Sequence, residues 1–321
     1  MRHISIDAIT DAAQHVYQAA VRTPLIKLDL PFTDASGPEV YLKLESLQPI
    51  GSFKIRGAWN AVRKLSQAQM RDGVWTVSAG NAAQGVAFAA RLAGVPCSVM
   101  VMDTAPQTKL RAIERLGATI VTASYDECWA TVEAHASPRM RGHFVHPFDD
   151  DDFIAGNATA GLEILEDLPD VDAVVAALGG GGLLAGIGTV MRARKPNVRV
   201  YAAEPETAAP LELSLRRGEA CRFEGWQPSF VDGAGGKSVL PSMWPLLKDL
   251  VAGSIVMPLS EVAAAMRKAA DRVHVVAEGA GGTAIAAAIS GRAGTGKVVA
   301  IVSGGNIDLT RFAELTTHAN A

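Results

Sequence analysis

The run Gly51-Ser52-Phe53-Lys54-Ile55-Arg56-Gly57 places a lysine directly after an aromatic residue, between a short apolar strand at Val40–Glu45 and a predicted helix. An amine held at such a turn loses part of its hydration, which lowers its pKa and makes it a usable nucleophile near neutral pH. The same run also fits a surface lysine in the first turn of a helix. The motifs in the rest of the chain distinguish a nucleophilic lysine from a surface lysine.

Length and composition restrict the class of protein. The 321 residues are 49% hydrophobic and 20% charged, enough for a large core and two lobes of a soluble globular protein. The formal net charge is −3 and no cluster of Lys and Arg stands out, so we expect no nucleic-acid partner. No apolar run approaches 18 residues and residues 1–7 have no apolar signal core, so we expect no membrane span.

The cysteines indicate the compartment. Cys97, Cys128 and Cys221 are odd in number and far apart, which argues against both a disulfide framework and a Cys-x-x-Cys metal site. Free thiols of this kind are typical of a reducing environment, so the predicted location is the cytoplasm.

Apolar strand patterns alternate with helical periodicity along nearly the whole chain, which predicts an α/β fold with parallel sheets covered by helices. The predicted strands are Val40–Glu45, Val74–Val77, Cys97–Met102, Thr119–Thr122, Phe144–His146, Ala173–Ala177, Val198–Ala203 and Val298–Val302. The predicted helices are Asn81–Ala93, Gln107–Leu116, Tyr125–Ala136, Ala158–Glu166, Leu183–Arg194, Leu259–Arg272 and Thr283–Arg292. Residues 222–237 break the alternation and are predicted to form an ordered loop near a site.

Parallel sheets bind ligands beyond the carboxyl ends of their strands, and four such strand ends carry small or polar residues. The glycines Gly179–Gly182 follow one strand and open a helix, which leaves backbone N–H groups free to bind a phosphate. A rival interpretation uses the same region. Gly180, Gly182 and Ala185 also fit G-x-G-x-x-A, with Glu204 about twenty residues on, as in nicotinamide-dinucleotide enzymes.

Two further turns offer polar groups at strand ends. Ser78-Ala79-Gly80-Asn81 closes a strand, and its N–H groups and amide suit a carboxylate and a phenolic oxygen; alternatively, Ser78 or Asn81 caps the next helix. Ser303-Gly304-Gly305-Asn306 follows the last strand. Its hydroxyl suits a ring nitrogen, or it caps the short terminal helix.

These motifs, together with Ala203-Glu204-Pro205, occur in an order and spacing that resemble the fold-type-II pyridoxal-phosphate enzymes. The resemblance is to the serine/threonine dehydratase and serine racemase branch and runs from about Thr23 to Asp308. It implies a tryptophan-synthase-β-like architecture of two lobes with mostly parallel sheets and the active site between them. The implied large domain comprises residues 1–72 and 150–321, the small domain residues 73–149, and the implied assembly is a homodimer.

The resemblance also implies a role for each site residue. Lys54 would form the Schiff base with pyridoxal phosphate, Phe53 would pack against the pyridine ring and Asn81 would contact the phenolic oxygen. The implied phosphate and pyridine-nitrogen contacts are Gly179, Gly180, Gly181, Gly182 and Ser303. The implied substrate-binding residues are Ser78, Ala79, Asn81 and Ala82.

The activity implied is β-elimination from a β-hydroxy amino acid, which yields a 2-oxo acid and ammonia. A neutral Ser303 leaves the pyridine ring a weaker electron sink, which favours prompt loss of a β-leaving group. Ala79 stands where the racemase pattern has a second catalytic serine, which makes a racemase less consistent with this chain. A β-replacement enzyme, an NAD-dependent dehydrogenase and a catalytically inactive cofactor-binding protein each account for part of the pattern and stay open.

Two departures from the family pattern lead to further expectations. Ala82 replaces the usual histidine and, with Gly279–Gly282 and Ala234–Gly236, predicts room for a bulkier substrate such as phenylserine. The alternative is that Trp59, Phe88 or Phe148 fills that room.

The second departure concerns a divalent cation that relatives often hold near Glu204, with a second carboxylate six residues later. That place is Pro210 here, which has no ligand side chain, so no metal site is predicted; Glu204 and Ala208 are the candidates near that turn, and Glu206 is the substitute.

Overall fold

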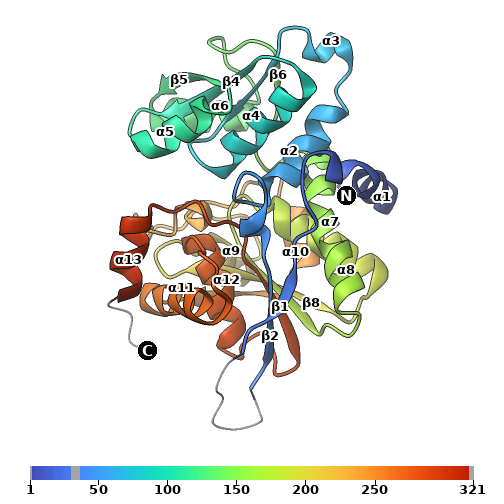
Figure 1. The fold of residues 1–321 in the computed structure, drawn as a ribbon, viewed down its shortest axis with the longest axis vertical. Helices are drawn as coiled ribbons and strands as arrows, with labels where there is room; N and C mark the ends of the chain where they lie inside the picture. Colours follow the sequence, from blue (N-terminus) through green and yellow to red (C-terminus); the bar gives the residue numbers. More distant parts are fainter. Residues whose placement is uncertain (1, 30–36, 318–321) are drawn as a thin grey trace.

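The computed structural model describes residues 2–29 and 37–317, and this part of the chain contains a six-stranded and a four-stranded sheet in two lobes (Figure 1). The larger sheet has the order β1-β2-β10-β7-β8-β9 and the smaller one β5-β4-β3-β6. The strands are β1 Leu25–Lys27, β2 Glu39–Lys43, β3 Val74–Val77, β4 Cys97–Met102, β5 Thr119–Ala123, β6 His143–Phe144, β7 Ala173–Ala177, β8 Arg199–Pro205, β9 Gly253–Met257 and β10 Lys297–Ile301.

The larger sheet is parallel except for β1, which pairs antiparallel with β2. Its side chains alternate between two cores. Val174 and Ala176 pack with α1 (Ile6–His15), α7 (Asp151–Asp167), α8 (Gly182–Arg194) and α10 (Trp244–Leu250). Ala173 and Val175 pack with α11 (Leu259–Val273) and α12 (Gly279–Ile289) on the opposite face. Both faces are therefore covered, as continuous apolar strands require.

The smaller sheet is parallel throughout and is likewise covered on both faces. One face packs against α2 (Lys54–Arg63), α4 (Asn81–Ala93) and α5 (Gln107–Glu114), and the other against α6 (Tyr125–Ala134). The remaining helices are α3 Gln67–Met70, α9 Pro210–Arg217 and α13 Leu309–Thr317, with 3-10 turns η1 Val16–Gln18, η2 Glu45–Leu47 and η3 Asp232–Ala234.

Helix α2 lies where the two lobes meet, packed against both α4 and α7 (Figure 1). The helices approach closely because glycines face each other's backbone. A Cβ atom on Gly57 would overlap the Phe153 ring, and one on Gly156 would overlap the Arg56 carbonyl oxygen. This close approach fixes the start of α2, and with it Lys54, against the larger lobe.

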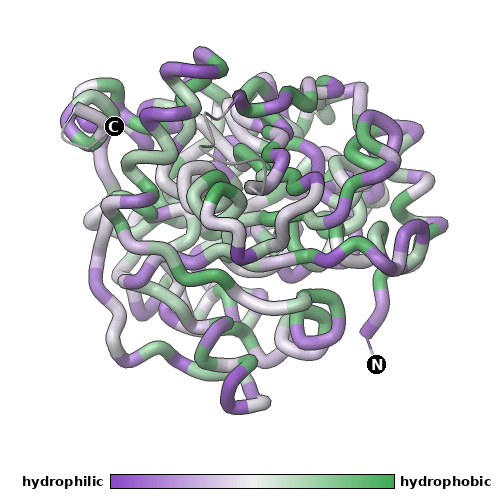
Figure 2. The backbone as a smooth tube through the Cα atoms, turned by 90° about the horizontal axis from the view of Figure 1, so that it is seen from below, coloured by the Kyte–Doolittle hydropathy of each residue, from purple (hydrophilic) through white to green (hydrophobic). Residues whose placement is uncertain are grey.

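Most of the predicted elements are confirmed, with corrections at their ends and some omissions. Helix α7 begins at Asp151 instead of Ala158 because the Asp150 side chain accepts the Phe153 N–H over 2.7 Å and caps it. Strands β1 and β9 and helices α1, α3, α9 and α10 were not predicted. Figure 2 shows hydrophobic and hydrophilic stretches alternating along the chain, as amphipathic elements require. The domain boundaries at residues 72/73 and 149/150 stay a prediction.

The three cysteines are buried free thiols, as predicted. Among the helices described, none combines the length and apolar character that crossing a bilayer demands.

Candidate active site

Lys54 is the first residue of α2, and its amine is buried. Nζ donates a hydrogen bond to the Pro147 carbonyl oxygen over 2.6 Å and lies 5.3 Å from the ring centroids of both Phe53 and Phe153. Burial lowers the pKa of Lys54 to about 8 from an ordinary value of 10.5. A substantial fraction of the amine is therefore neutral near physiological pH, as a nucleophile or base must be.

A buried ionic network anchors the helix that carries Lys54. Arg56 has no exposed side-chain surface and donates to Glu45 Oε1 over 2.7 Å and to Glu163 Oε1 over 2.6 Å. Lys43 Nζ, also buried, lies 2.6 Å from Glu163 Oε2 and donates to the Thr23 carbonyl oxygen over 2.7 Å. Because two buried cations face two buried carboxylates, the charges are balanced within the network.

The turn before Lys54 is joined to the turn after β10. The Phe53 N–H donates to the Ser303 carbonyl oxygen over 3.0 Å, and the Gly305 N–H donates to the Gly51 carbonyl oxygen over 2.9 Å. Ser303 is 4% exposed, and among the described residues its hydroxyl finds no hydrogen-bond partner. It does not cap α13, a role that falls to Asp308, whose carboxylate accepts the Arg311 N–H. The prediction that Ser303 caps the terminal helix is therefore wrong.

The four glycines form a backbone cradle at the start of α8. Gly181 has a φ of +93°, in the left-handed region that favours glycine, and α8 begins at Gly182. A Cβ atom on Gly180 would overlap the Phe148 ring. Within the described parts of the chain, the N–H groups of Gly179–Gly182 have no acceptor. Free N–H groups at a helix N-terminus are suited to bind an anion such as phosphate.

Helix α4 begins at Asn81, and its N-cap is Gly80 without a side-chain bond. Neither Ser78 nor Asn81 caps the helix, so the capping interpretation is wrong for both. Ser78 Oγ instead accepts the Gly80 N–H over 3.1 Å. Asn81 Nδ2 donates to Glu278 Oε1, and Asn81 Oδ1 accepts from Asn306 Nδ2, each over 2.7 Å.

All of the predicted cofactor and substrate residues line one cavity of about 380 Å³ between the lobes. They are Phe53, Lys54, Ser78, Ala79, Asn81, Ala82, Gly179, Gly180, Gly181, Gly182 and Ser303. Among the aromatic residues considered as fillers, Phe148 lines this cavity, whereas Trp59 and Phe88 pack elsewhere, against the cluster around Val16.

Glu278, at the cavity wall, was missed as a functional candidate. It is 6% exposed and immediately precedes α12. Burial, together with the nearby Asp232, raises the pKa of Glu278 to about 7. An acid at the start of a glycine-rich helix is the sequence signal that could have pointed to it.

The candidate metal ligands lie outside this cavity. Glu204 is buried, and its two carboxylate oxygens accept the N–H groups of Leu211 and Glu212 over 2.8 Å each, with Ser254 Oγ at 2.6 Å. Glu204 thus satisfies the N-terminus of α9, whose first residue is Pro210. Glu206 Oε1 likewise accepts the Leu259 N–H of α11, and Ala208 is buried without a ligand side chain.

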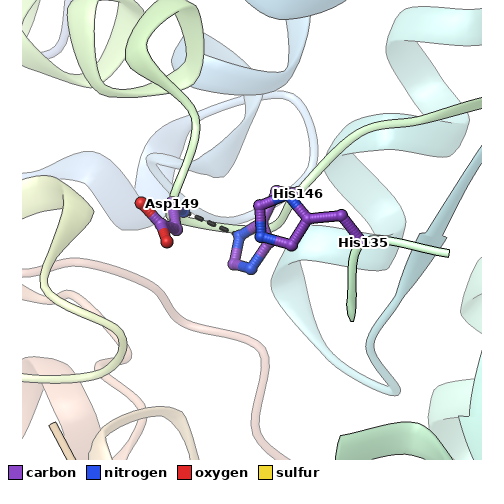
Figure 3. Close-up of side chains that lie close together, drawn as sticks. All are labelled: His135, His146 and Asp149. Carbon is purple, nitrogen blue, oxygen red and sulfur yellow. Dashed lines mark hydrogen bonds between the residues drawn. The ribbon is translucent and has the colours of Figure 1, made fainter. Parts of the chain in front are cut away.

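His135, His146 and Asp149 form a second group with metal-like spacing, their ligand atoms lying within 4.8 Å of one another (Figure 3). His146 Nδ1, however, accepts the N–H groups of Phe148 and Asp149, and the Asp149 carboxylate bonds to Arg2 and Ser242. Burial lowers the pKa of His146 to about 3, so the ring is neutral. The group therefore holds the segment that presents the Pro147 carbonyl oxygen to Lys54.

Comparison with known proteins matches residues 16–304 to the family described as pyridoxal-phosphate dependent enzyme. The chain belongs to this family. It is 39% identical over 309 residues to L-threonine ammonia-lyase of Thermotoga maritima, a match that covers 95% of this chain and 76% of that protein.

Solved structures of a serine racemase and a threonine deaminase show the same fold. Maize serine racemase superposes with a TM-score of 0.87 at 30% identity, covering 99% of this chain and 98% of that one. Threonine deaminase isoform 2 of Solanum lycopersicum superposes with a TM-score of 0.86 at 30% identity, covering 98% and 93%.

The cavity fits the cofactor of this family, pyridoxal phosphate. The unpartnered glycine N–H groups suit its phosphate, the free Ser303 hydroxyl suits its ring nitrogen, and the buried Lys54 amine suits its aldehyde. The site does not fit a nicotinamide dinucleotide. Both carboxylate oxygens of Glu204 accept hydrogen bonds from α9 and Ser254, so Glu204 is not free to bind a ribose.

Proposed function

We propose that the protein catalyses β-elimination from a β-hydroxy amino acid, releasing a 2-oxo acid and ammonia. The observation that carries this proposal is a buried Lys54 amine in one cavity with the Ser78–Ala82 turn and the glycine cradle. The similarity to L-threonine ammonia-lyase supports the same reaction class. Water is lost across the Cα–Cβ bond, and the enamine that results takes up water again as it releases ammonia, so the reaction balances without a further reactant.

The residues divide the work according to their positions. Pyridoxal phosphate, when bound, supplies the electron sink that stabilises negative charge at Cα. Lys54 would hold the cofactor through Nζ, and the same Nζ would take the proton from Cα of the substrate, since its lowered pKa leaves the amine able to accept one. Ser78 and the N–H groups around Asn81 and Ala82 hold the substrate carboxylate. The N–H groups of Gly179–Gly182 would hold the cofactor phosphate, and the Ser303 hydroxyl would contact the ring nitrogen.

A racemase requires a second group that exchanges a proton on the other side of Cα. In the resemblance to racemases, Ala79 stands at the position of that group; Ala79 lines the cavity, and its methyl group cannot exchange a proton. We therefore propose elimination as the main reaction. The homodimer and the cytoplasmic location expected from the sequence stay predictions.

The test is ammonia release by the purified holoenzyme across a panel of β-hydroxy amino acids, with the 2-oxo acid and the enantiomeric composition measured in parallel. We expect 2-oxo acid and ammonia in equal amounts without added thiol, and no release by Lys54→Ala. Activity that depends on an added thiol would establish β-replacement. Inversion without ammonia would establish a racemase, and bound cofactor without turnover would establish an inactive protein.

We also propose a preference for substrates bulkier than serine and threonine, such as phenylserine. Ala82, Ala280 and Gly233 all line the cavity with small side chains or none. An apolar β-substituent that fills this room gains ~1–3 kcal/mol over a small one. We expect kcat/KM to be highest for phenylserine and Ala82→His to shift the ratio toward threonine. A clear preference of the unaltered enzyme for serine and threonine contradicts this part of the proposal.

A further inference from the structure

A second cavity of about 400 Å³ adjoins the active-site cavity. The two share a wall formed by residues of both lobes: Val77, Ser78, Ala79, Met102, Pro147, Phe148 and Asp232. At this wall Ala79 contributes a single methyl group. The second cavity therefore lies next to the substrate site, on the other side of the turn proposed to hold the substrate carboxylate.

The lining of this second cavity is mainly apolar and aromatic. Cys128 and Val132 on α6 are buried, and Trp129 and Trp226 add large rings. Trp129 Nε1 donates to Glu133 Oε1 and Trp226 Nε1 donates to the Gly235 carbonyl oxygen, each over 2.9 Å. Because both indole N–H groups are satisfied by the protein, these residues offer ring surface to a ligand without a further need for a polar partner.

Lys237 ties the two sides of the second cavity together. Its Nζ lies 4.4 Å from the Tyr125 ring centroid and 4.3 Å from the Trp226 ring centroid. Tyr125 begins α6, whereas Trp226 and Lys237 belong to the loop of residues 222–237, so the ammonium bridges the two lobes. The other charged residue of the lining, Asp232, is paired with Lys109. Both charges thus already have partners, and the cavity is suited to an uncharged ring.

We propose that this second cavity receives an aromatic β-substituent of the substrate and determines specificity for it. The inference rests on the proposed function for the placement of the substrate: the carboxylate at the Ser78–Ala82 turn and the amine at Lys54. With these two groups held, the substituent on Cβ extends through the room beside Ala82 and past Ala79, so that its ring enters the aromatic lining. Trp129, Tyr125 and Trp226 are then the residues that recognise the ring.

The experiment measures binding of amino acids that lack a β-hydroxyl group and so cannot eliminate it. The holoenzyme is titrated with L-phenylalanine and with L-alanine, and separately with their D-enantiomers, by calorimetry and by the change in cofactor absorbance. We expect phenylalanine of one configuration to bind about 10- to 100-fold more tightly than the matching alanine. Equal affinities, or no saturable binding of either, overturn the inference.

Variants locate the effect. Trp129→Ala should reduce the preference for phenylalanine over alanine by about tenfold or more, and the kcat/KM ratio of phenylserine to threonine in parallel. Trp244→Ala removes an equally half-buried tryptophan from α10, outside both cavities, and serves as the matched control. Tyr125 is 42% exposed, so Tyr125→Ala provides a second variant with little risk to folding. The inference is overturned if neither Trp129→Ala nor Tyr125→Ala lowers the preference for phenylalanine over alanine more than Trp244→Ala does.

The outcomes separate this inference from the proposed function. Tight phenylalanine binding that depends on Trp129, without ammonia release from any β-hydroxy amino acid, leaves the second cavity assigned and the lyase activity refuted. Ammonia release from a β-hydroxy amino acid, with no preference for phenylalanine over alanine, supports the lyase activity and refutes the assignment of the second cavity.

Discussion

Asn81 and Glu278 join the two lobes at the active site, because the Asn81 Nδ2 group donates to Glu278 Oε1 over 2.7 Å. Asn81 begins α4 beside the smaller sheet, and Glu278 directly precedes α12 on the larger one. Asn306 Nδ2 donates to the Oδ1 atom of the same Asn81 amide. The amide is therefore held in one orientation, with one Nδ2 N–H donated to Glu278; we propose that the second N–H donates to the phenolic oxygen of the cofactor.

The first prediction concerns pH. The pKa of Glu278 is raised to about 7 from 4.5, so its carboxyl is neutral below that pH and ionises above it, where it accepts a stronger hydrogen bond from Asn81. We expect kcat/KM and the cofactor absorbance to show a transition near pH 7 that Glu278→Gln removes. Glu261→Gln, at an exposed acid on α11, is the control. An unchanged transition in Glu278→Gln would refute the assignment.

The second prediction concerns stability. Burial raises the pKa of Glu204 to about 7, so the folded protein holds a proton that the unfolded chain releases near pH 4.5. This contribution to the free energy of unfolding is present below pH 4.5 and is lost as the pH rises to 7, by ~3 kcal/mol at most. Chemical denaturation at pH 5 and pH 8 should show that the free energy of unfolding falls less between these pH values in Glu204→Gln than in the unaltered protein. The exposed Glu219→Gln should lose as much as the unaltered protein does.

The third prediction concerns the buried ionic network. Arg56→Met leaves Glu45 and Glu163 buried without their main cationic partner, which we expect to cost about 3–5 kcal/mol of unfolding free energy. Arg22→Met removes a pair of partly exposed ion pairs to Glu166 and Asp167 and should cost less than about 1 kcal/mol. Urea denaturation of both variants measures the difference, and equal costs would show that burial of the Arg56 network does not matter.

The fourth prediction concerns the glycine cradle. A Cβ atom on Gly180 would overlap the Phe148 ring, so Gly180→Ala should displace the loop and raise the Kd for pyridoxal phosphate by about tenfold or more. Gly253→Ala places its methyl group 3.7 Å from Tyr201, an ordinary contact, and should bind the cofactor as the unaltered protein does. Cofactor absorbance after exhaustive dialysis provides the measurement. Full retention by Gly180→Ala would contradict the cradle.

The elements that could be predicted are those whose local pattern is strong. Strand Val74–Val77 is a buried apolar run and helix Asn81–Ala93 is periodic, and both were predicted with their correct bounds. Strand β1 has three residues and runs antiparallel at the sheet edge, and β9 begins with Gly253 and Ser254, so neither offers a clear apolar run. Their pairing depends on β2 and β8, which is tertiary information.

The candidate site could be predicted where each turn carries its own signal, as the lysine turn and the glycines do. The acid before the glycine-rich helix α12 marks the position of Glu278 in the sequence, but its raised pKa and the second cavity could not be found in this way. Glu278 acquires its raised pKa from burial and from Asp232, and Lys237 meets Tyr125 and Trp226 only after the lobes fold together. These relationships depend on burial or join residues on opposite lobes, so no local pattern carries them.

Strand β10, the last of the larger sheet, lies in its interior between β2 and β7. During synthesis on the ribosome, the edges of β2 and β7 that pair with β10 therefore have no partner until residues 297–301 have left the exit tunnel. The smaller sheet, complete by Phe144, has no such delay. A nascent chain that stops short of β10 would expose two apolar strand edges to aggregation and proteolysis. The same late strand delivers Ser303 to the lysine turn, so the cell completes the sheet and the cofactor pocket in a single event.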